Sequence, residues 1–560
     1  MAMRNAILRG AFGRLPSPVK KSIRETVQSL KPHLSYSWWI RHAEAKPDAR
    51  ELAKEVEAFR YKPTVSIVTP VYNTPIELLD RAIESVLCQV YANWELCLCD
   101  DLSTRAEVCE RLEYWAKKDS RIKLLMSERN EGISGASNRA LALATGEFVG
   151  FLDHDDELTF DALAEVVRML QKNCEADIIY SDEDKLDTEG RRIQPYFKPD
   201  WSPEYMLSMM YVCHFSVYRR NLLEEIGGFR EEVKAGPDYD VFLRASERAR
   251  AVLHVPKILY HWRMAPNSIA RSSDEKPDAF EAGRRAVSDH LQRKGIAAKV
   301  VHGNAPGFYR VRFCLDGNER VAIAVLESGA GDVERCAATI EEKTNYRNRE
   351  IIRVSAEPEN GRPNLSRMIN WGVAEANADY VVIMHDDIEP ISREWIEAML
   401  GFCRQKEIGA VGARLLYRTG ELQHIGIVPG LNGVAGYPLR GLFSSRLGYP
   451  DPNHFVRNCS AVSAACMMVK KSTFEEVGGF DERLPRAYSD LDFCLKIREK
   501  GYRIVWTPEA EFYHDECEAA NESDSEEMEY LKRRWGKALE IDPYYSPNLT
   551  VKYEDMGYRV

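Results

Sequence analysis

The sequence predicts an α/β protein with two tandem domains of one kind, each built on a mostly parallel sheet, preceded by a helical N-terminal segment. Two observations predict this class. The chain has 560 residues, which is enough for two to four domains with cores of their own. Sequence landmarks also recur in the same order at an offset of about 250 residues, which indicates a duplicated domain.

Three landmarks make up the repeat. An apolar strand that ends in acids reads FVGFLDHDD at 148–156 and YVVIMHDDIE at 380–389. A GGF triplet follows at 227–229 and again at 478–480. Each triplet is followed by an aspartate, and each aspartate by a histidine 23 or 24 residues further on. The aspartates are Asp238 and Asp490, and the histidines are His261 and His514.

Within the first copy, β-rich runs at 65–72 and 95–101 flank a helical pattern at 75–89. Strand, helix, strand order predicts a parallel sheet. Acids at the carboxyl ends of these strands would then share one edge, where open α/β sheets bind ligands. We expect a basic helical segment at 1–60, a first domain at 61–300, a linker at 301–320, a second domain at 321–545 and a tail at 546–560.

The composition argues against several protein classes. A net charge of −11 disfavours a nucleic-acid-binding protein. The 13 cysteines form no CxxC pair and no zinc-site spacing, which predicts reduced thiols and a cytoplasmic protein. The sequence contains neither an apolar run of about 18 residues nor a signal-peptide pattern. We therefore expect a chain that neither spans a membrane nor is exported.

Residues 1–41 depart from the acidic average. Eight basic residues and one acidic residue give this stretch a charge of +7, and apolar residues with two tryptophans are interspersed. This composition suits an anionic membrane surface and predicts peripheral attachment to the inner face of the plasma membrane. The alternative is an ordinary surface helix packed on the first domain.

The turn LDHDD offers the first candidates for chemistry. Asp153, Asp155 and Asp156 follow the strand FVGFL and precede a helix that begins near Phe160. Mg²⁺ and Mn²⁺ are usually held by one or two carboxylates together with substrate phosphates. A solvated acidic turn at a helix N-terminus is the alternative for any lone DxD.

The first copy resembles the family 2 glycosyltransferases, strongly over about 61–300, and the second copy resembles them more loosely over about 320–545. The resemblance is closest to bacterial O-antigen and rhamnan-type polysaccharide glycosyltransferases with two tandem domains. It implies the GT-A fold, a Rossmann-like fold of nucleotide-diphospho-sugar transferases. The stretches that carry it are VTPVYN (68–73), ELCLCDD (95–101), RNEGISGASNRAL (129–141), LDHDD (152–156), GPDYDVFLR (236–244) and LYHWR (259–263).

The resemblance also implies residue roles. The metal, Mn²⁺ or Mg²⁺, would be held by Asp155 and His261 with support from Asp156. Asp238 is the implied catalytic base, although Pro237 stands where the family usually has an acid or a glutamine. The nucleotide-sugar would be bound by Pro70, Tyr72, Asn73, Asp100, Asp101, Asn138, Arg139 and Asp153.

These roles imply an inverting transfer. Asp238 would remove the proton of the acceptor hydroxyl in a single displacement, while the metal neutralises the charge that develops on the diphosphate leaving group. The stretches YSDEDK (180–185) and FKPDWSPEYML (197–207) resemble the family's acceptor side. They nominate Asp182, Glu183, Lys198 and Trp201 for contacts with the acceptor, and a structural loop with Trp201 in the core is the alternative.

The second copy lacks part of this set. If EIIRVSAE (350–357) is laid on ELCLCDDL (95–102), Ser355 and Ala356 stand at the positions of Asp100 and Asp101. Met384 is expected at the position of Asp153. Two interpretations stay open, a bifunctional enzyme with both copies active and a second copy that holds acceptor or serves as a scaffold. The candidates that this copy keeps are Asp386, Asp387, Asp490 and His514.

The expected function is transfer of a hexose or deoxyhexose from a nucleotide-diphosphate donor to a hydroxyl of a growing, lipid-linked bacterial surface polysaccharide. A nucleotidyltransferase would need a Gly-rich basic phosphate loop, and a Rossmann dehydrogenase would need GxGxxG after the first strand; the sequence has neither. A third alternative is a non-catalytic scaffold that binds glycans, in which Asp155, Asp238 and His261 would be dispensable.

Overall fold

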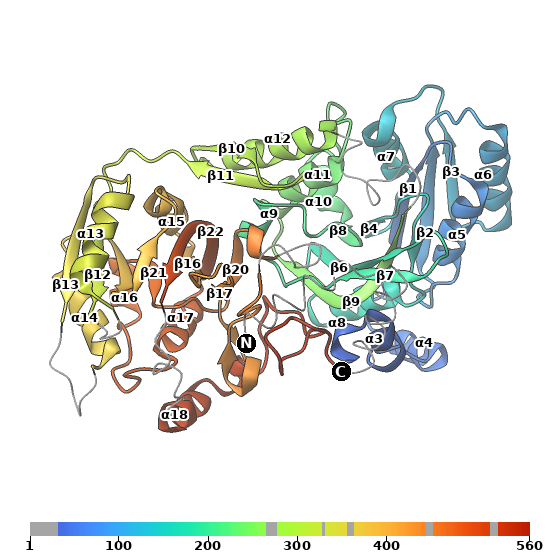
Figure 1. The fold of residues 1–560 in the computed structure, drawn as a ribbon. Coiled ribbons are helices and arrows are strands. Elements are labelled where there is room, and N and C mark those ends of the chain that lie inside the picture. Colours follow the sequence, from blue (N-terminus) through green and yellow to red (C-terminus); the bar gives the residue numbers. More distant parts are fainter. Residues whose placement is uncertain (1–31, 265–276, 328–330, 356–362, 444–451, 516–524) are drawn as a thin grey trace, which may run out of the picture.

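The computed structural model describes residues 32–264, 277–327, 331–355, 363–443, 452–515 and 525–560. It has two lobes, and a hairpin of β10 (Ala298–His302) and β11 (Tyr309–Phe313) leads from the first to the second (Figure 1). Each lobe holds a large mixed sheet with helices packed on it, which confirms the α/β class with tandem domains. The first 31 residues of the basic segment, and Ala356, lie outside the described residues.

A nine-stranded sheet forms the first lobe, in the order β3-β2-β1-β4-β8-β6-β9-β5 with β7 paired to β6. Strands β1 to β4 are parallel, but β8 runs antiparallel to both of its neighbours, so the sheet is mixed rather than mostly parallel. The strands are β1 Val65–Val71, β2 Trp94–Asp100, β3 Ile122–Met126, β4 Phe148–Phe151, β5 Glu157–Leu158, β6 Ile178–Leu186, β7 Arg192–Tyr196, β8 Ser216–Arg219 and β9 Val252–Arg263.

Both faces of this sheet are buried. Along β1, Ile67 packs into one apolar cluster and its neighbour Val68 into another, because successive side chains of a strand point to opposite faces. Helix α5 places Leu79, Ile83 and Val86 in the first of these clusters with helical spacing. The helices are α3 Tyr36–His42, α4 Ala49–Ala58, α5 Ile76–Leu87, α6 Ala106–Lys118, α7 Gly132–Ala142, α8 Ala162–Lys172, α9 Pro203–Met206, α10 Arg220–Glu225, α11 Pro237–Ser246 and α12 Pro277–Arg293, with a short 3-10 turn η1 at Pro32–Leu34.

The second lobe repeats the strand order of the first. Its sheet runs β13-β12-β14-β21-β16-β22-β15, which matches β2-β1-β4-β8-β6-β9-β5 position by position. Its strands are β12 Val321–Leu326, β13 Arg349–Val354, β14 Tyr380–His385, β15 Ile388–Pro390, β16 Ile408–Leu416, β17 Leu422–His424, β20 Arg457–Cys459, β21 Cys466–Lys470 and β22 Arg503–His514, and β18 Val428–Pro429 pairs with β19 Ala435–Gly436. Its helices are α13 Val333–Lys343, α14 Leu365–Glu375, α15 Trp395–Cys403, α16 Lys471–Glu476, α17 Ser489–Glu499 and α18 Ser525–Trp535, with 3-10 turns at Leu431–Gly433, Pro452–His454 and Gly536–Leu539.

The GGF landmark is held in the same way in both lobes. The side chain of Asn138 accepts a hydrogen bond from the Phe229 N–H (2.9 Å) and donates one to the Phe229 carbonyl (2.8 Å). Asn370 makes the same pair of contacts with Phe480, at 2.8 and 3.0 Å. A shared side-chain anchor, added to a shared strand order, indicates that the two lobes are copies of one domain.

The lobes are joined by polar contacts as well as by a common apolar cluster. Ser202 donates to the Asn458 carboxamide (2.8 Å), and Arg503 of β22 pairs with Glu204 (2.7 Å). The C-terminal segment also reaches the first lobe, because the Asn548 side chain donates to Asp182 (3.1 Å) and to the Pro256 carbonyl (2.9 Å). Figure 1 shows the C-terminus beside α3, between the lobes. Within the ranges described, the helices are too short or too polar to cross a membrane.

Candidate active site

The pairing of β1 with β2 and β4 brings the predicted acids to one sheet edge. Val71, at the end of β1, is in register with Asp100, at the end of β2. β4 ends at Phe151, and the turn that follows carries Asp153, Asp155 and Asp156. This edge is the carboxyl end of the parallel strands, the place where open α/β sheets bind ligands.

The two acids after β2 have different surroundings. Asp101 accepts hydrogen bonds from the N–H groups of Glu131 (2.7 Å) and Gly132 (2.9 Å), so it fixes the start of α7. Burial raises the pKa of Asp101. Asp100 accepts hydrogen bonds at Oδ2 from the Ser103 N–H (2.9 Å) and the Cys109 thiol (3.9 Å), whereas its buried Oδ1 has no hydrogen-bond partner among the described residues. A buried acceptor without a partner is costly, so the Asp100 Oδ1 atom fits a site for a ligand N–H or O–H.

Several predicted nucleotide contacts shape the surrounding loops instead. Asn73 accepts hydrogen bonds from the N–H groups of Thr104 (2.9 Å) and Arg105 (3.3 Å), and Asn138 holds the GGF turn. Both side chains are therefore engaged with protein in this structure. The Arg139 guanidinium contacts Glu131 (3.0 Å), Tyr72 is 46% exposed, and Pro70 is half-buried at the end of β1.

Three carboxylates crowd the turn after β4. Asp156 is 1% exposed and accepts hydrogen bonds from the Tyr260 hydroxyl (2.6 Å) and the Arg263 N–H (2.7 Å). Burial, followed by the charges of Asp155 and Asp153, raises the pKa of Asp156 well above its usual value. Burial and the charge of Asp153 also raise the pKa of Asp155, against the lowering effect of His154. Clustered carboxylates with raised pKa values and oxygen donors fit a hard divalent cation.

His214 lies in the middle of this edge, and sequence reasoning missed it. Its Nε2 lies 3.8 Å from Asp153 Oδ2, its Nδ1 lies 3.4 Å from Glu183 Oε2, and its ring stacks on Tyr260 at 4.6 Å. Burial alone would lower the pKa of His214, but the hydrogen bond and charge of Glu183, with the charge of Asp153, raise it to about 9. A single histidine before β8 belongs to no spaced motif, so only the fold reveals its position.

His261 is tied to the N-terminal helix through Asp184. The His261 Nδ1 atom lies 2.5 Å from Asp184 Oδ1, and Asp184 Oδ2 accepts from the Tyr36 hydroxyl and from Arg192, each at 2.5 Å. The Asp184 side chain is fully buried. A carboxylate on one ring nitrogen orients the imidazole and leaves Nε2 as the ligand atom, the usual arrangement behind metal-binding histidines. β9 pairs with β5, which places His261 opposite Glu157, one residue beyond the acidic turn.

Replacement of Asp184 by asparagine should weaken Mn²⁺ binding by about 10- to 100-fold, the effect expected when a carboxylate behind a metal-binding histidine is lost. Tyr36→Phe removes only the hydroxyl that α3 donates to Asp184, so we expect a smaller loss in the same direction. Calorimetric titration with Mn²⁺ in the presence of a nucleoside diphosphate measures both effects. Unchanged Mn²⁺ affinity in a folded Asp184→Asn protein would remove His261 from the metal site.

Asp238 occupies the first turn of α11, after Gly236 in the left-handed conformation (φ 58°). Burial and the charge of Asp153 raise the pKa of Asp238, while the charge of His214 lowers it. Its neighbour Asp240 is bound by Arg230 and by Arg244 (2.8 Å). Asp240 therefore has a structural role, whereas the charges of Asp153 and His214 act on Asp238.

The predicted acceptor-side residues need a correction. Asp182 and Lys198 are fully buried, and Glu183 is 4% exposed. The Lys198 ammonium donates to the carbonyls of Ser181 (2.7 Å), Val212 (2.6 Å) and His214, and it pairs with Glu183 (3.2 Å). These three side chains hold the segment together and are not open to an acceptor in this structure. Trp201 is half-buried and packs on Phe242 and Tyr211.

The strand register corrects the comparison of the two copies. Val65 of β1 pairs with Phe148, and the equivalent Val321 of β12 pairs with Tyr380. Counting on from these pairs, Met384 matches Leu152 in the core, and His385 and Asp387 match Asp153 and Asp155. The register of β12 with β13 places Ser355 at the position of Asp100, so the second lobe has no acid there.

The second lobe nevertheless brings three metal-type ligands together. Single ligand atoms of His385, Asp387 and His514 all lie within 4.8 Å of one another. His514 Nε2 lies 3.2 Å from Asp387 Oδ1, and its Nδ1 lies 2.6 Å from Gln423 Oε1. Burial alone would raise the pKa of Asp387, but the hydrogen bond and charge of His514 hold it below its usual value. Asp386 is 4% exposed beside this group.

Asp490 stands in the first turn of α17, as Asp238 does in α11. It accepts hydrogen bonds from the N–H groups of Leu491 (2.8 Å) and Ala464 (3.4 Å). Burial raises the pKa of Asp490 to about 6. The second lobe therefore keeps the acid on the helix and a metal-type cluster, but not the acid at the end of its second strand.

Comparisons with known proteins identify relatives of the first lobe. Residues 66–227 match the model of Glycosyl transferase family 2. The chain is 32% identical over 212 residues to the putative colanic acid biosynthesis glycosyl transferase WcaA of Escherichia coli, with 34% of this chain and 73% of that protein covered.

Two relatives match almost the whole chain. An uncharacterized protein of Sinorhizobium fredii is 39% identical over 545 residues, and the O-antigen biosynthesis protein RfbC of Myxococcus xanthus is 33% identical over 548 residues. They cover 90% and 92% of this chain, whereas the chain spans 60% and 43% of their lengths. Among solved structures, S. aureus TarS in complex with UDP-GlcNAc matches at 22% identity with a TM-score of 0.35, over 41% of this chain and 66% of that chain.

Proposed function

Because the chain belongs to the family 2 glycosyltransferases, we propose that its first lobe transfers a sugar from a nucleotide-diphosphate donor to a hydroxyl of a growing bacterial surface polysaccharide. The names of relatives support the polysaccharide, since one is an O-antigen biosynthesis protein and another a colanic acid biosynthesis transferase. We further propose that the transfer inverts the anomeric centre and uses a divalent metal.

One geometric observation carries this proposal. The open acceptor of Asp100 and the acidic turn with His214 lie at the carboxyl ends of neighbouring strands, and the charges of Asp153 and His214 reach Asp238 on α11, which supports one shared site. Asp153 and His214 lie close enough to shift the pKa of Asp238 in opposite directions. A donor bound at Asp100 and Asp153 would thus have its reactive end near a carboxylate that accepts a proton.

Each residue has a proposed task. Asp155 and His261 would hold Mn²⁺ or Mg²⁺, with support from Asp156, which Tyr260 and Arg263 hold in place, and Asp153 would contact the nucleotide-sugar. The metal, when bound, supplies positive charge to the diphosphate leaving group. Asp238, in the first turn of α11, would take the proton of the acceptor hydroxyl.

A second candidate function rests on the second lobe. The cluster of His385, Asp387 and His514, with Asp490 on α17, favours a bifunctional enzyme in which this lobe also acts on a metal-bound donor. Ser355 at the position of Asp100 favours instead a lobe that holds acceptor or serves as a scaffold. A lipid-linked acceptor and attachment of residues 1–41 to an anionic membrane surface remain proposals based on the sequence.

Calorimetric titration with UDP, dTDP and GDP, with and without Mn²⁺, tests these proposals. We expect one nucleotide to bind in a metal-dependent way and Asp100→Ala to weaken that binding by about tenfold, because the ligand loses one hydrogen bond to a charged group. Asp387→Ala removes one member of the metal-type cluster in the second lobe. Loss of a second binding event in Asp387→Ala would support two transferases, and no metal-dependent binding of any nucleotide would reject both.

A further inference from the structure

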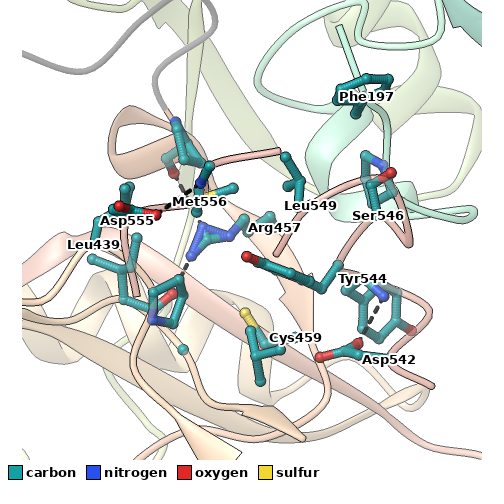
Figure 2. A pocket seen from close by; sticks show the side chains of 18 of the residues that line it. Phe197, Leu439, Arg457, Cys459, Asp542, Tyr544, Ser546, Leu549, Asp555 and Met556 are labelled. Atoms are coloured by element: carbon teal, nitrogen blue, oxygen red, sulfur yellow. Dashed lines mark hydrogen bonds between the residues drawn. The ribbon is translucent and has the colours of Figure 1, made fainter. Parts of the chain in front are cut away.

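A cavity of about 350 Å³ lies where the two lobes meet the C-terminal segment (Figure 2). Most of its wall comes from distant parts of the chain: the stretch around His33, residues 195–199 at the end of β7 and beyond, residues 425–428 with 457–460 of the second lobe, and residues 542–558. Ligand sites of proteins have volumes of roughly 300 to 1,000 Å³. The cavity is thus large enough for a small ligand, and it lies outside the candidate active site.

The wall combines aromatic rings with polar groups that the protein holds in place. The Arg457 guanidinium donates to the carbonyls of Ile425 and Pro452 (3.2 Å for the latter) and lies over the Trp506 ring at 4.8 Å. Asp542 accepts hydrogen bonds from the Ser460 hydroxyl (2.7 Å) and the Tyr544 N–H (2.8 Å). Figure 2 shows Arg457, Asp542 and Tyr544 around the cavity, with Phe197 above them.

The hydroxyl of Tyr544 is available for a hydrogen bond with a ligand. Its ring lines the cavity, and its hydroxyl has no hydrogen bond to any residue of the described chain. The rings of Tyr196, Tyr205 and Phe197 line the same cavity. Aromatic faces next to a hydroxyl, a carboxylate and a guanidinium match a ligand that has both C–H faces and hydroxyl groups.

A pyranose ring has this character, because its C–H face packs on aromatic rings while its hydroxyls exchange hydrogen bonds at the rim. An isoprenoid chain would instead cover Tyr544, Asp542 and Arg457 with hydrocarbon. Each polar group that loses its water without a new partner costs about 1–3 kcal/mol. The wall therefore favours sugar units over the hydrocarbon part of a lipid carrier.

One short segment separates the cavity from the candidate active site. Tyr196, Phe197 and Pro199 line the cavity, while the buried ammonium of Lys198, between them in the sequence, donates to the carbonyl of His214. His214 in turn lies beside Asp153. A glycan held in the cavity would thus lie close to the lobe that acts on its end.

We propose that this cavity binds one or two sugar units of the acceptor polysaccharide, away from the hydroxyl that reacts. The proposal rests on the proposed transferase function, since it names a second contact for the same acceptor. It gives the C-terminal segment a role in substrate binding, because residues 542–558 supply Asp542 and Tyr544.

Saturation-transfer NMR tests the proposal on the full chain with Asp238→Asn, without donor or metal. The probes are methyl α-L-rhamnopyranoside, methyl β-D-glucopyranoside and the corresponding N-acetylglucosaminide, each at millimolar concentration. We expect at least one to bind, Tyr544→Ala to weaken that binding by about tenfold, and Tyr544→Phe to weaken it less, because only the hydroxyl is lost. Trp371→Ala, which removes a 48% exposed ring elsewhere in the second lobe, should leave binding unchanged.

Three results would overturn the proposal. The first is that no glycoside binds. The second is that the wild type and both Tyr544 variants bind equally well. The third is that geranyl phosphate binds and the glycosides do not, which would assign the cavity to an isoprenoid. Tyr544→Phe provides a second test in case the Tyr544→Ala protein does not fold. Nucleotide titration of the Tyr544 variants separates the two proposals: intact nucleotide binding without glycoside binding rejects only the cavity, and glycoside binding without nucleotide binding rejects only the transferase.

Discussion

Asp238→Asn should lower sugar transfer by about 10²- to 10⁴-fold, because a positioned general base contributes this much to a rate. The amide cannot take the proton of the acceptor hydroxyl, yet it has nearly the same shape as the carboxylate. Metal-dependent nucleotide binding should therefore persist, since the base acts on the acceptor. Transfer is measured with the nucleotide-sugar whose nucleotide binds in the titration, and binding by calorimetry.

The rate should also depend on pH in a defined direction. Burial and the charge of Asp153 raise the pKa of Asp238, so the base becomes protonated at a higher pH than an ordinary aspartate, whose pKa is about 3.9. Activity should be full above the raised pKa and fall as the pH drops through it. His214 lowers the pKa of Asp238, so His214→Ala should move this acid limb to still higher pH.

Asp490→Asn is the matched control, because Asp490 has the same place on the equivalent helix. If only the first lobe is active, Asp490→Asn transfers at the wild-type rate. A large loss in Asp490→Asn with full activity in Asp238→Asn would move the reaction to the second lobe. Loss of nucleotide binding in a folded Asp238→Asn protein would count against its role as the base.

Lys198→Met should destabilise the first lobe by about 3–5 kcal/mol, the usual cost of removing one partner of a buried ion pair. The change removes one of the two cations beside the Glu183 carboxylate, and it leaves three carbonyls without the ammonium that now donates to them. Burial alone would raise the pKa of Glu183, but Lys198 and His214 lower it to about 2, so Glu183 stays ionised at neutral pH. Thermal and urea unfolding measure the effect.

Two comparisons sharpen this prediction. Lys198→Met combined with Glu183→Gln should recover part of the loss, because the unpaired charge disappears. Lys117→Ala, at a side chain that is 77% exposed, should change stability by no more than about 0.5 kcal/mol. A stable Lys198→Met protein with reduced transfer would restore the expectation that Lys198 contacts the acceptor.

Sequence reasoning could place the candidate acids at one sheet edge because these acids follow strands. Asp100 and Asp153 come directly after apolar runs, and the pairing of β1 with β2 and β4 fixes where such residues meet. The duplication could be predicted as well, since GGF and the paired acids are local patterns. The α/β class and the family could be predicted correctly because both depend on these short-range sequence patterns.

The remaining features depend on contacts between distant residues. Nothing near Asn138 shows that its side chain holds Phe229, 91 residues away, and nothing near Lys198 shows that three carbonyls enclose its ammonium. His214 is positioned by Glu183 of β6 and lies beside Asp153 of the turn after β4, and both residues are distant from it in the sequence. Comparison of the two sequences places Met384 at the position of Asp153 because it aligns similar residues. The strand pairing, which the sequence does not reveal, aligns Met384 with Leu152 instead.

The hydrogen bonds of Asn548 also bear on how the chain is made. Its partner Pro256 precedes it by 292 residues. At about 5–20 residues per second, a ribosome needs about 15–60 s to cover that interval. The Pro256 carbonyl lacks the Asn548 side chain for this time, and Asp182 lacks it for longer, because Asp182 precedes Asn548 by 366 residues. The first lobe therefore emerges from the ribosome with these polar groups not yet covered, beside a cavity whose wall is incomplete. Folding of this region is completed only when the C-terminal segment has been synthesised.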